Sequence, residues 1–153
     1  LDYVSSMSNN LAYVLAVERL AGVTPPERAM YIRVIVAELQ RIASHCLWLG
    51  THAMDIGAMT VLLYSFRERE HVLDLFEEYC GARLTYNCMR IGGLPLDIPS
   101  GWDKKVTAFC DLMEPKLDEY EELLTNNRIL DRKSLFSLLK SLRIHRNRFE
   151  IIK

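Results

Sequence analysis

The stretch TPPERAMYIRVIVAELQRIASHCLWL, residues 24–49, decides the fold class. Its apolar side chains recur every three or four residues, which places them on one face of an α-helix; they are Ile32, Ile35, Val36, Leu39, Ile42, Ala43, Cys46 and Leu47. Thr24 as N-cap, Pro25 in the first helical position and a glutamate three residues after the cap form a capping box. We therefore predict a helix that begins at Pro25 and ends between Gly50 and Gly57.

Three further segments show helical periodicity. The first covers residues 8–21 and stops at Gly22, and the second covers about residues 59–79 and stops at Gly81. The third begins at Ser100 and carries a heptad seam for packing on another helix; the seam is Val106, Cys110, Met113, Leu117, Tyr120 and Leu124. Alternation typical of strands is weak throughout, so the sequence predicts an all-α antiparallel helical bundle.

Two details qualify this bundle. Residues 83–98 contain Gly92, Gly93 and Pro95, which indicate a loop or a short hairpin. Pro115 lies inside the last predicted helix and should kink it.

The composition is that of an ordinary folded protein. The chain has 153 residues, 50% apolar and 25% charged, which is enough for one domain with a core. Its four cysteines form no C-x-x-C pair, so we expect reduced thiols and no metal bound by them. No start methionine or signal peptide precedes Leu1, which suggests a fragment or a processed chain. We expect no nucleic-acid partner.

The charge is unevenly distributed. Residues 1–130 hold 12 basic and 18 acidic side chains, whereas residues 131–153 hold 7 basic and 2 acidic ones. The end of the chain therefore differs in chemistry from the rest.

Residues 42–66 contain no Lys, Arg or Glu but carry one carboxylate, Asp55. A membrane span is unfavourable, because an ionised carboxylate in hydrocarbon costs roughly 2.5 to 3.5 kcal/mol on insertion scales. Burial inside a bundle is the less costly arrangement, and it would raise the pKa of Asp55. The alternative is that Asp55 caps the next helix by accepting from its first N–H groups. Spacing alone does not separate the two.

A polar stripe follows one side of the helix from residue 25. Glu38, Arg41, His45, His52 and Asp55 are spaced by three, four, seven and three, so an unbroken helix would align them. The simplest interpretation is a Glu38–Arg41 surface pair and a satisfied core histidine. A carboxylate-bridged dimetal centre is unfavourable, because neither Glu38 nor Glu18 has a histidine three residues on.

Five segments carry a resemblance to a known family: LDYVSSMSNNLAYVLAVERL, PPERAMYIRVIVAELQRIASH, GTHAMDIGAMTVLLYSFRERE, LDLFEEYCGARLTYNCMRIGG and DEYEELLTNNRI. Together they resemble the D (49 kDa) subunit family of proton-pumping NADH:quinone oxidoreductase, respiratory complex I, over residues 1–130. The family is similar in fold to the large subunit of nickel-iron hydrogenases. The terminal Cys pairs that bind nickel there have no counterpart here.

The resemblance implies roles for individual residues. Tyr3 matches a tyrosine that donates a hydrogen bond to a quinone carbonyl, and Asp55 matches an acid that pairs with a quinone-site histidine, which belongs to a segment upstream of Leu1. Both are expected to be catalytic and quinone-binding. Arg90 matches an arginine close to the terminal iron–sulfur cluster of a neighbouring subunit. Thr85 stands where some members carry a histidine near that cluster. Supporting roles fall to Glu38, Arg41 and His45.

The implied setting is a peripheral membrane protein. The chain would bind no cofactor itself, take quinone as substrate and face a [4Fe-4S] cluster in an adjacent subunit. Its partners would be other peripheral-arm subunits and the membrane subunit at the quinone site. The expected location is the cytoplasmic side of a bacterial inner membrane, or the mitochondrial matrix side.

The resemblance ends near residue 130. We therefore divide the chain into an incomplete helical-bundle domain, residues 1–130, and a divergent basic tail, residues 131–153. The tail resembles a frameshifted product, although an amphipathic helix on a membrane or partner is an alternative. The competing function is accordingly a truncated, non-catalytic remnant or interaction module.

Overall fold

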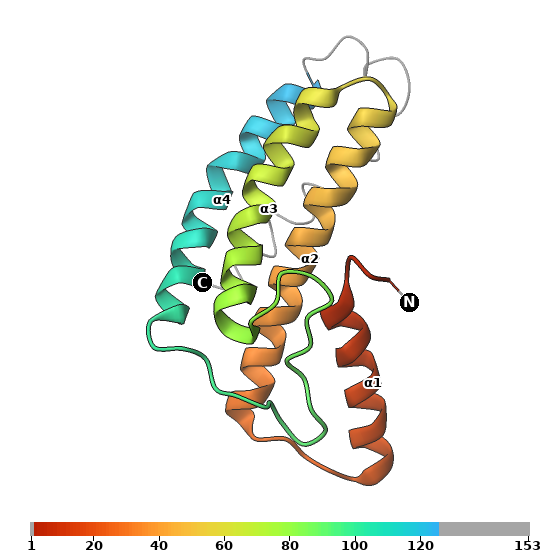
Figure 1. Cartoon of the computed structure of the whole chain (residues 1–153), viewed down its shortest axis with the longest axis vertical. Helices are drawn as coiled ribbons and strands as arrows, with labels where there is room; N and C mark the ends of the chain where they lie inside the picture. Colours follow the sequence, from red (N-terminus) through yellow and green to blue (C-terminus); the bar gives the residue numbers. More distant parts are fainter. Residues whose placement is uncertain (1, 126–153) are drawn as a thin grey trace.

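The computed structural model describes residues 2–125, which form four α-helices and no β-strand (Figure 1). In chain order they are α1 (Ser6–Ala21), α2 (Glu27–Asp55), α3 (Met59–Cys80) and α4 (Trp102–Thr125). The prediction of an all-α bundle is confirmed for this part of the chain. Residues 83–98 form a loop, and its one isolated bridge pairs Arg90 with Gly93.

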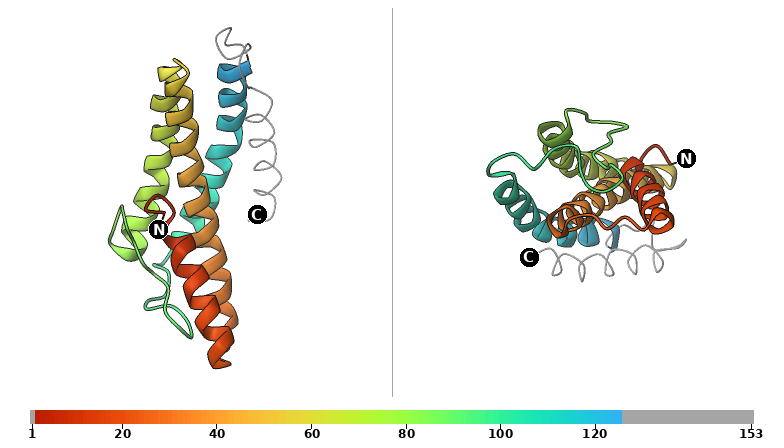
Figure 2. Two further views of the ribbon diagram at one scale, coloured as in Figure 1. Left: turned by 90° about the vertical axis from the view of Figure 1, so that its right-hand side faces the viewer. Right: turned by 90° about the horizontal axis from the view of Figure 1, so that it is seen from below.

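The longest helix, α2, is the axis of the molecule. Helix α3 runs back along it, α4 packs against α3, and α1 lies beside the first half of α2 (Figures 1 and 2). The loop between α3 and α4 crosses over towards α1 (Figure 1). None of the helices in residues 2–125 is both long enough and apolar enough to cross a membrane.

The start of α2 differs from the prediction. The helix begins at Glu27 with Pro26 as its N-cap, and no side chain caps it. The capping box at Thr24 is therefore wrong. A residue that precedes proline is driven out of the helical region, so Pro25 cannot be helical in front of Pro26. The helix can start only after the second proline.

The end of α2 lies within the predicted range, because the helix passes through Gly50 and stops at Asp55. A Cβ on Gly50 would lie 2.5 Å from Ser65 Oγ and 3.1 Å from Leu62 Cα. Gly50 is thus the point at which α2 and α3 approach each other closely. The chain turns at Gly57, whose φ of 96° is open to glycine.

The other helix ends follow the sequence pattern more closely. Helix α1 begins two residues earlier than predicted, at Ser6, and ends as predicted before Gly22. Helix α3 ends before Gly81, which also has left-handed backbone angles. Helix α4 continues past Pro115 to Thr125.

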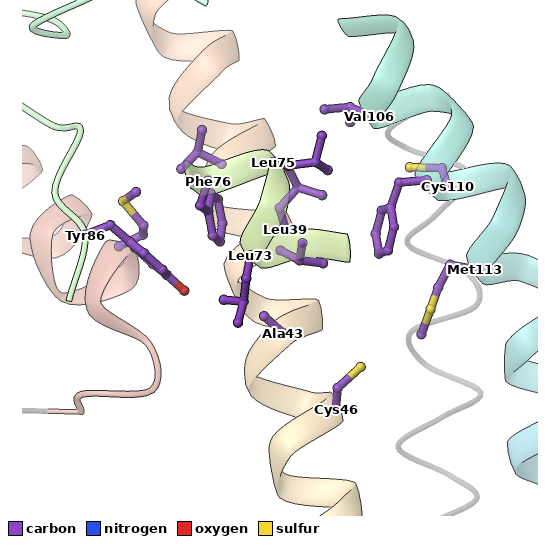
Figure 3. Packing of buried hydrophobic residues seen from close by; sticks show 14 of the residues in the cluster. Leu39, Ala43, Cys46, Leu73, Leu75, Phe76, Tyr86, Val106, Cys110 and Met113 are labelled. Carbon is purple, nitrogen blue, oxygen red and sulfur yellow. The ribbon is translucent and has the colours of Figure 1, made fainter. Parts of the chain in front are cut away.

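The core lies where α2, α3 and α4 meet (Figure 3). Its largest side chain is Trp102, which is fully buried at the start of α4 and donates from its ring nitrogen to Leu75 O at 2.9 Å. The predicted seam of α4 is buried along its whole length, from Val106 to Leu124. The Tyr86 ring of the loop packs on Phe76 with ring centres 4.5 Å apart.

Candidate functional site

A tight turn at residues 90–93 is held by a buried ion pair that comes from two helices. The Arg33 guanidinium on α2 donates to both Glu18 oxygens on α1, at 2.7 and 3.0 Å. The same guanidinium donates to Arg90 O at 2.7 Å and to Gly93 O at 3.0 Å. Glu18 also accepts from the Gly92 N–H at 2.7 Å. One ion pair therefore ties α1, α2 and the turn together.

The pair is shielded from water. The Arg33 and Glu18 side chains are only 2% and 5% exposed. The hydrogen bonds from Arg33 hold the pKa of Glu18 below its ordinary value, although burial opposes this shift. Removing one partner of such a pair leaves a buried charge uncompensated, which costs about 3–5 kcal/mol. Sequence reasoning missed both residues, although Glu18 interrupts the apolar face of its helix.

The turn presents Arg90 to solvent. Arg90 and Gly93 exchange both backbone hydrogen bonds at 3.1 Å, so the turn between them is short. The Arg90 side chain is exposed and donates to Met89 O at 2.8 Å and to Asn87 Oδ1 at 3.1 Å. A cation at this position is fixed in place and open to an approaching group.

Thr85 lies earlier in the same loop and is exposed. Its φ of 52° is unusual for a β-branched residue, which is strained in this region. The loop is held here by Tyr86, whose carbonyl accepts from Asn10 of α1 at 3.3 Å. Cys88 adds a contact with Met7, with their sulfur atoms 3.5 Å apart.

Tyr3 is presented at the surface just before α1. Its side chain is 75% exposed. The segment around it is fixed by the backbone, since Gln40 Nε2 of α2 donates to Val4 O at 2.8 Å and Asn9 Nδ2 donates to Asp2 O at 2.8 Å. The phenol is therefore open to a ligand while its main chain is anchored.

Asp55 departs from the sequence-based expectation. It is the last residue of α2 and its side chain is exposed, so the predicted desolvation of this carboxylate is wrong within residues 2–125. Nor does Asp55 cap α3, because the N-cap of that helix is Ala58 and no side chain caps it. Of the apolar residues next to Asp55 in sequence, Ala53 is buried, whereas Met54 is exposed.

Tyr3 and Asp55 are not brought together. Tyr3 adjoins Val4, which is bonded to Gln40. Asp55 lies 15 residues further along α2, which is about 22 Å at 1.5 Å per residue. Figure 1 shows the N-terminal segment beside the middle of α2, well away from its end. A single small headgroup cannot contact both residues in this arrangement.

The polar stripe on α2 exists because the helix is continuous. Glu38 and Arg41 form an ion pair at 2.7 Å, as the simplest interpretation predicted. His45 is half-buried, and the His52 ring stacks on Trp48 with ring centres 5.6 Å apart. The stripe leads from Glu38 near the anchored N-terminal segment to Asp55.

Comparison with known proteins shows to which family the chain belongs. The family model described as "Respiratory-chain NADH dehydrogenase, 49 Kd subunit" matches residues 55–135. The chain belongs to this family. It is 57% identical over 128 residues to the D subunit of the NADH-quinone oxidoreductase of Campylobacter curvus, covering 84% of this chain and 31% of the relative.

Two further relatives in the 49 kDa family show a similar identity and coverage. The D 2 subunits of the NADH-quinone oxidoreductases of Solibacter usitatus and Thermodesulfovibrio yellowstonii are 58% and 59% identical over 129 residues. Those alignments cover 84% of this chain and 35% and 32% of the two relatives. The chain thus spans about a third of the length of the curated relatives that it matches.

A second buried group in this member of the 49 kDa family was also missed. Glu68 of α3 is 1% exposed and pairs with Arg67. His71 lies 3.9 Å from it, and burial together with the Glu68 charge raises the pKa of the Cys46 thiol to about 12. Burial likewise raises the pKa of the Tyr120 phenol. The Glu-x-x-His spacing is the sequence signal from which Glu68 and His71 could have been identified as a candidate pair.

No set of three or more His, Cys, Asp or Glu side chains within residues 2–125 is grouped so as to hold a metal ion. None of the four cysteines in that part of the chain belongs to a disulfide, and Cys46, Cys88 and Cys110 are buried. Burial raises the pKa of Cys88 to about 12, so this thiol is protonated at neutral pH.

Proposed function

We propose that this chain forms part of the quinone-reduction site of a proton-pumping NADH:quinone oxidoreductase. The observation that carries the proposal is the 57–59% identity to D subunits of NADH-quinone oxidoreductase over 128–129 residues. The other subunits of the peripheral arm and the membrane subunit at the quinone site would be its partners. The fold would be that of the nickel-iron hydrogenase large subunit without its nickel ligands.

Tyr3 is proposed as the group that binds the quinone. A phenol can donate O–H to a quinone carbonyl and can release a proton. Its exposure and the anchored backbone around it support this role. The anchoring matters because a donor must be held within hydrogen-bond reach of its acceptor.

Asp55 is proposed to act with a group outside this chain. Its distance from Tyr3 argues against a shared contact with one headgroup, so its partner would be a histidine that a longer protein brings to the end of α2. A carboxylate beside a histidine favours the charged imidazolium, and the proton affinities of the two groups would then be coupled. Glu38, Arg41 and His45 would support this part of α2.

Arg90 is proposed to face a [4Fe-4S] cluster carried by an adjacent subunit. A fixed cation near a cluster favours its reduced state, which is how a protein raises a reduction potential. The turn held by Glu18 and Arg33 supports the proposal, because it fixes where the guanidinium can reach. Thr85 would lie near the same cluster and would supply no titratable group. The chain itself would hold no redox cofactor, and the cluster would supply the electrons.

The complex would place this chain on the cytoplasmic side of a bacterial inner membrane or on the matrix side of a mitochondrial one. The second candidate function is a non-catalytic remnant or interaction module.

The test is Tyr3→Phe at the matching position of an intact homologous complex. NADH-driven quinone reduction should fall at least about tenfold, while NADH oxidation by an artificial acceptor upstream of the quinone site should persist. Tyr13→Phe is the control, because Tyr13 is a comparably exposed tyrosine of α1, 65% accessible. Equal quinone turnover in both variants would remove Tyr3 from the mechanism. Failure of the chain to co-purify with the other subunits would instead favour the remnant.

A further inference from the structure

Gln40 is a polar side chain at a core position of α2. It is only 1% exposed, and on its face of the helix it lies between Val36 and Ala43, which are both buried. Its Nε2 donates to Val4 O at 2.8 Å. Its Oε1 is also buried, but it accepts no hydrogen bond within residues 2–125. One half of the amide is therefore used, and the other half has no partner there.

This arrangement is unfavourable for folding alone. A buried polar atom without a partner destabilises the folded state, and an apolar side chain of similar size would avoid that cost. The neighbouring core positions, Val36 and Ala43, are apolar in just this way. What Gln40 supplies in exchange is the bond to Val4 O, which lies one residue from Tyr3.

The segment that carries Tyr3 has no other hydrogen bond to α2 among the described residues. The Val4 N–H donates to Asp2 Oδ1 at 3.0 Å, which is a contact within the segment. Asn9 Nδ2 donates to Asp2 O at 2.8 Å, which ties the segment to α1. The bond from Gln40 is therefore the hydrogen bond that sets where the Tyr3 main chain lies along α2.

The loop between α3 and α4 reaches the same point. Burial raises the pKa of the Tyr86 phenol, and the Gln40 amide beside it opposes this rise. Figure 3 shows this phenol pointing towards α2. The Tyr86 carbonyl accepts from Asn10 of α1 at 3.3 Å, and Arg90 lies four residues further along the loop. Gln40 thus lies where the N-terminal segment, α2 and the loop that carries Arg90 meet.

We infer that Gln40 is a positioning residue for Tyr3, because its amide fixes the segment that carries the phenol at one point of α2, next to the loop that carries Arg90. The inference rests on the proposed function, in which Tyr3 donates to the quinone. Gln40 is buried and touches no substrate. It acts through Val4, by keeping the phenol oxygen within hydrogen-bond reach of a quinone carbonyl. Such placement matters because a shift of about 1 Å can lower a rate about a hundredfold.

The test is Gln40→Met at the matching position of an intact homologous complex, made alone and together with Tyr3→Phe. Methionine is similar in length to glutamine but cannot donate to Val4 O. Alone, the change should lower kcat/KM for quinone at least about fivefold, while KM for NADH and NADH oxidation by an upstream artificial acceptor stay the same. Together with Tyr3→Phe it should cost less than about twofold more, because the group that Gln40 positions is then missing.

Ser65→Ala is the matched control. Ser65 is a fully buried polar residue of α3, and its hydroxyl donates to Leu62 O of its own helix at 3.0 Å. Its replacement should change kcat/KM for quinone by less than about twofold. Gln40→Asn is a second variant in case methionine prevents assembly. It keeps an amide but is one CH₂ shorter, so the bond to Val4 O is lost, and its effect should depend on Tyr3 in the same way.

Three results would overturn the inference. Gln40→Met could cost the same factor with and without Tyr3→Phe, which would show that Gln40 does not act through the phenol. It could slow the upstream acceptor as much as quinone, which would indicate a general structural role. It could also leave quinone reduction unchanged although Tyr3→Phe lowers it tenfold. If Tyr3→Phe itself has no effect, the proposed role of Tyr3 fails, and the role of Gln40 fails with it.

Discussion

Replacing Glu18 by glutamine removes the charge that compensates Arg33 and leaves the shape of the site nearly unchanged. The bond from Arg33 to the second carboxylate oxygen is lost, and the remaining bonds from Arg33 and from the Gly92 N–H keep only a neutral amide oxygen as acceptor. Arg33 still donates to the carbonyl oxygens of Arg90 and Gly93. Its charge therefore stays buried, and these two oxygens compensate it only in part. We expect the free energy of unfolding to fall by about 3 kcal/mol, the low end for a broken buried pair.

The control is a similar pair at the surface. Arg28 donates to both Asp97 oxygens at 3.1 Å, but the two side chains are 65% and 62% exposed. Asp97→Asn should therefore destabilise the chain much less than Glu18→Gln. Urea unfolding followed by circular dichroism compares the variants. If Glu18→Gln costs no more than Asp97→Asn, the conclusion that the buried pair holds α1, α2 and the turn together is refuted.

The pH dependence gives an independent check on the same pair. The pKa of Glu18 is lower in the folded chain than the ordinary value of 4.5, so its contribution to stability is complete above that value. It is lost as the pH falls through the lowered folded-state pKa. The difference in stability between the unaltered chain and Glu18→Gln should therefore shrink in acid and be constant near neutral pH. A difference that grows on acidification would contradict the assignment.

Three shorter predictions follow from the backbone and the thiols. Gly50→Ala should lower the free energy of unfolding by about 1–3 kcal/mol, because its Cβ would collide with α3, whereas Gly93→Ala meets nothing within 4 Å and should cost less than about 0.5 kcal/mol in the same urea titration. Thr85→Asn should raise the melting temperature by relieving about 1 kcal/mol of strain, and a lowered value would contradict this. Burial raises the pKa of Cys46 to about 12, so this thiol should resist alkylation at pH 8 until the chain unfolds, as mass spectrometry of the labelled peptide would show.

The helices could be predicted from the sequence because their signals are local. Three- and four-residue spacing located all four described helices, and Gly22 and Gly81 gave correct ends. The start of α2 was predicted wrongly because the capping pattern at Thr24 was considered without the effect of Pro26 on the backbone of Pro25. Its end could be predicted only as the range from Gly50 to Gly57, because a glycine in a helix interior can also serve close packing against a neighbouring helix. That neighbour is not visible in local sequence.

The candidate site was less predictable because its contacts join distant parts of the chain. Arg33 is 15 residues from Glu18 and 60 from Gly93, whose carbonyl it binds. Arg33 occupies a core position of α2, and Glu18 lies on the apolar face of α1. A charge on each of two apolar faces is a signal for a buried pair, but it does not say what the pair holds. The exposure of Asp55 depended likewise on where the helix ends and not on its neighbours in sequence.

Helix α2 separates the Arg90 turn from Asp55 by a stiff span. From Arg33, which holds the turn, to Asp55 is 22 residues of continuous helix, or about 33 Å. This is about four Debye lengths at physiological ionic strength, so an electron arriving near Arg90 would exert almost no field on Asp55 through solvent. In the proposed site, coupling that passes through this chain would be mechanical, carried by a shift of α2 as a rod. Gly50, where α2 touches α3, is the contact that such a shift would disturb.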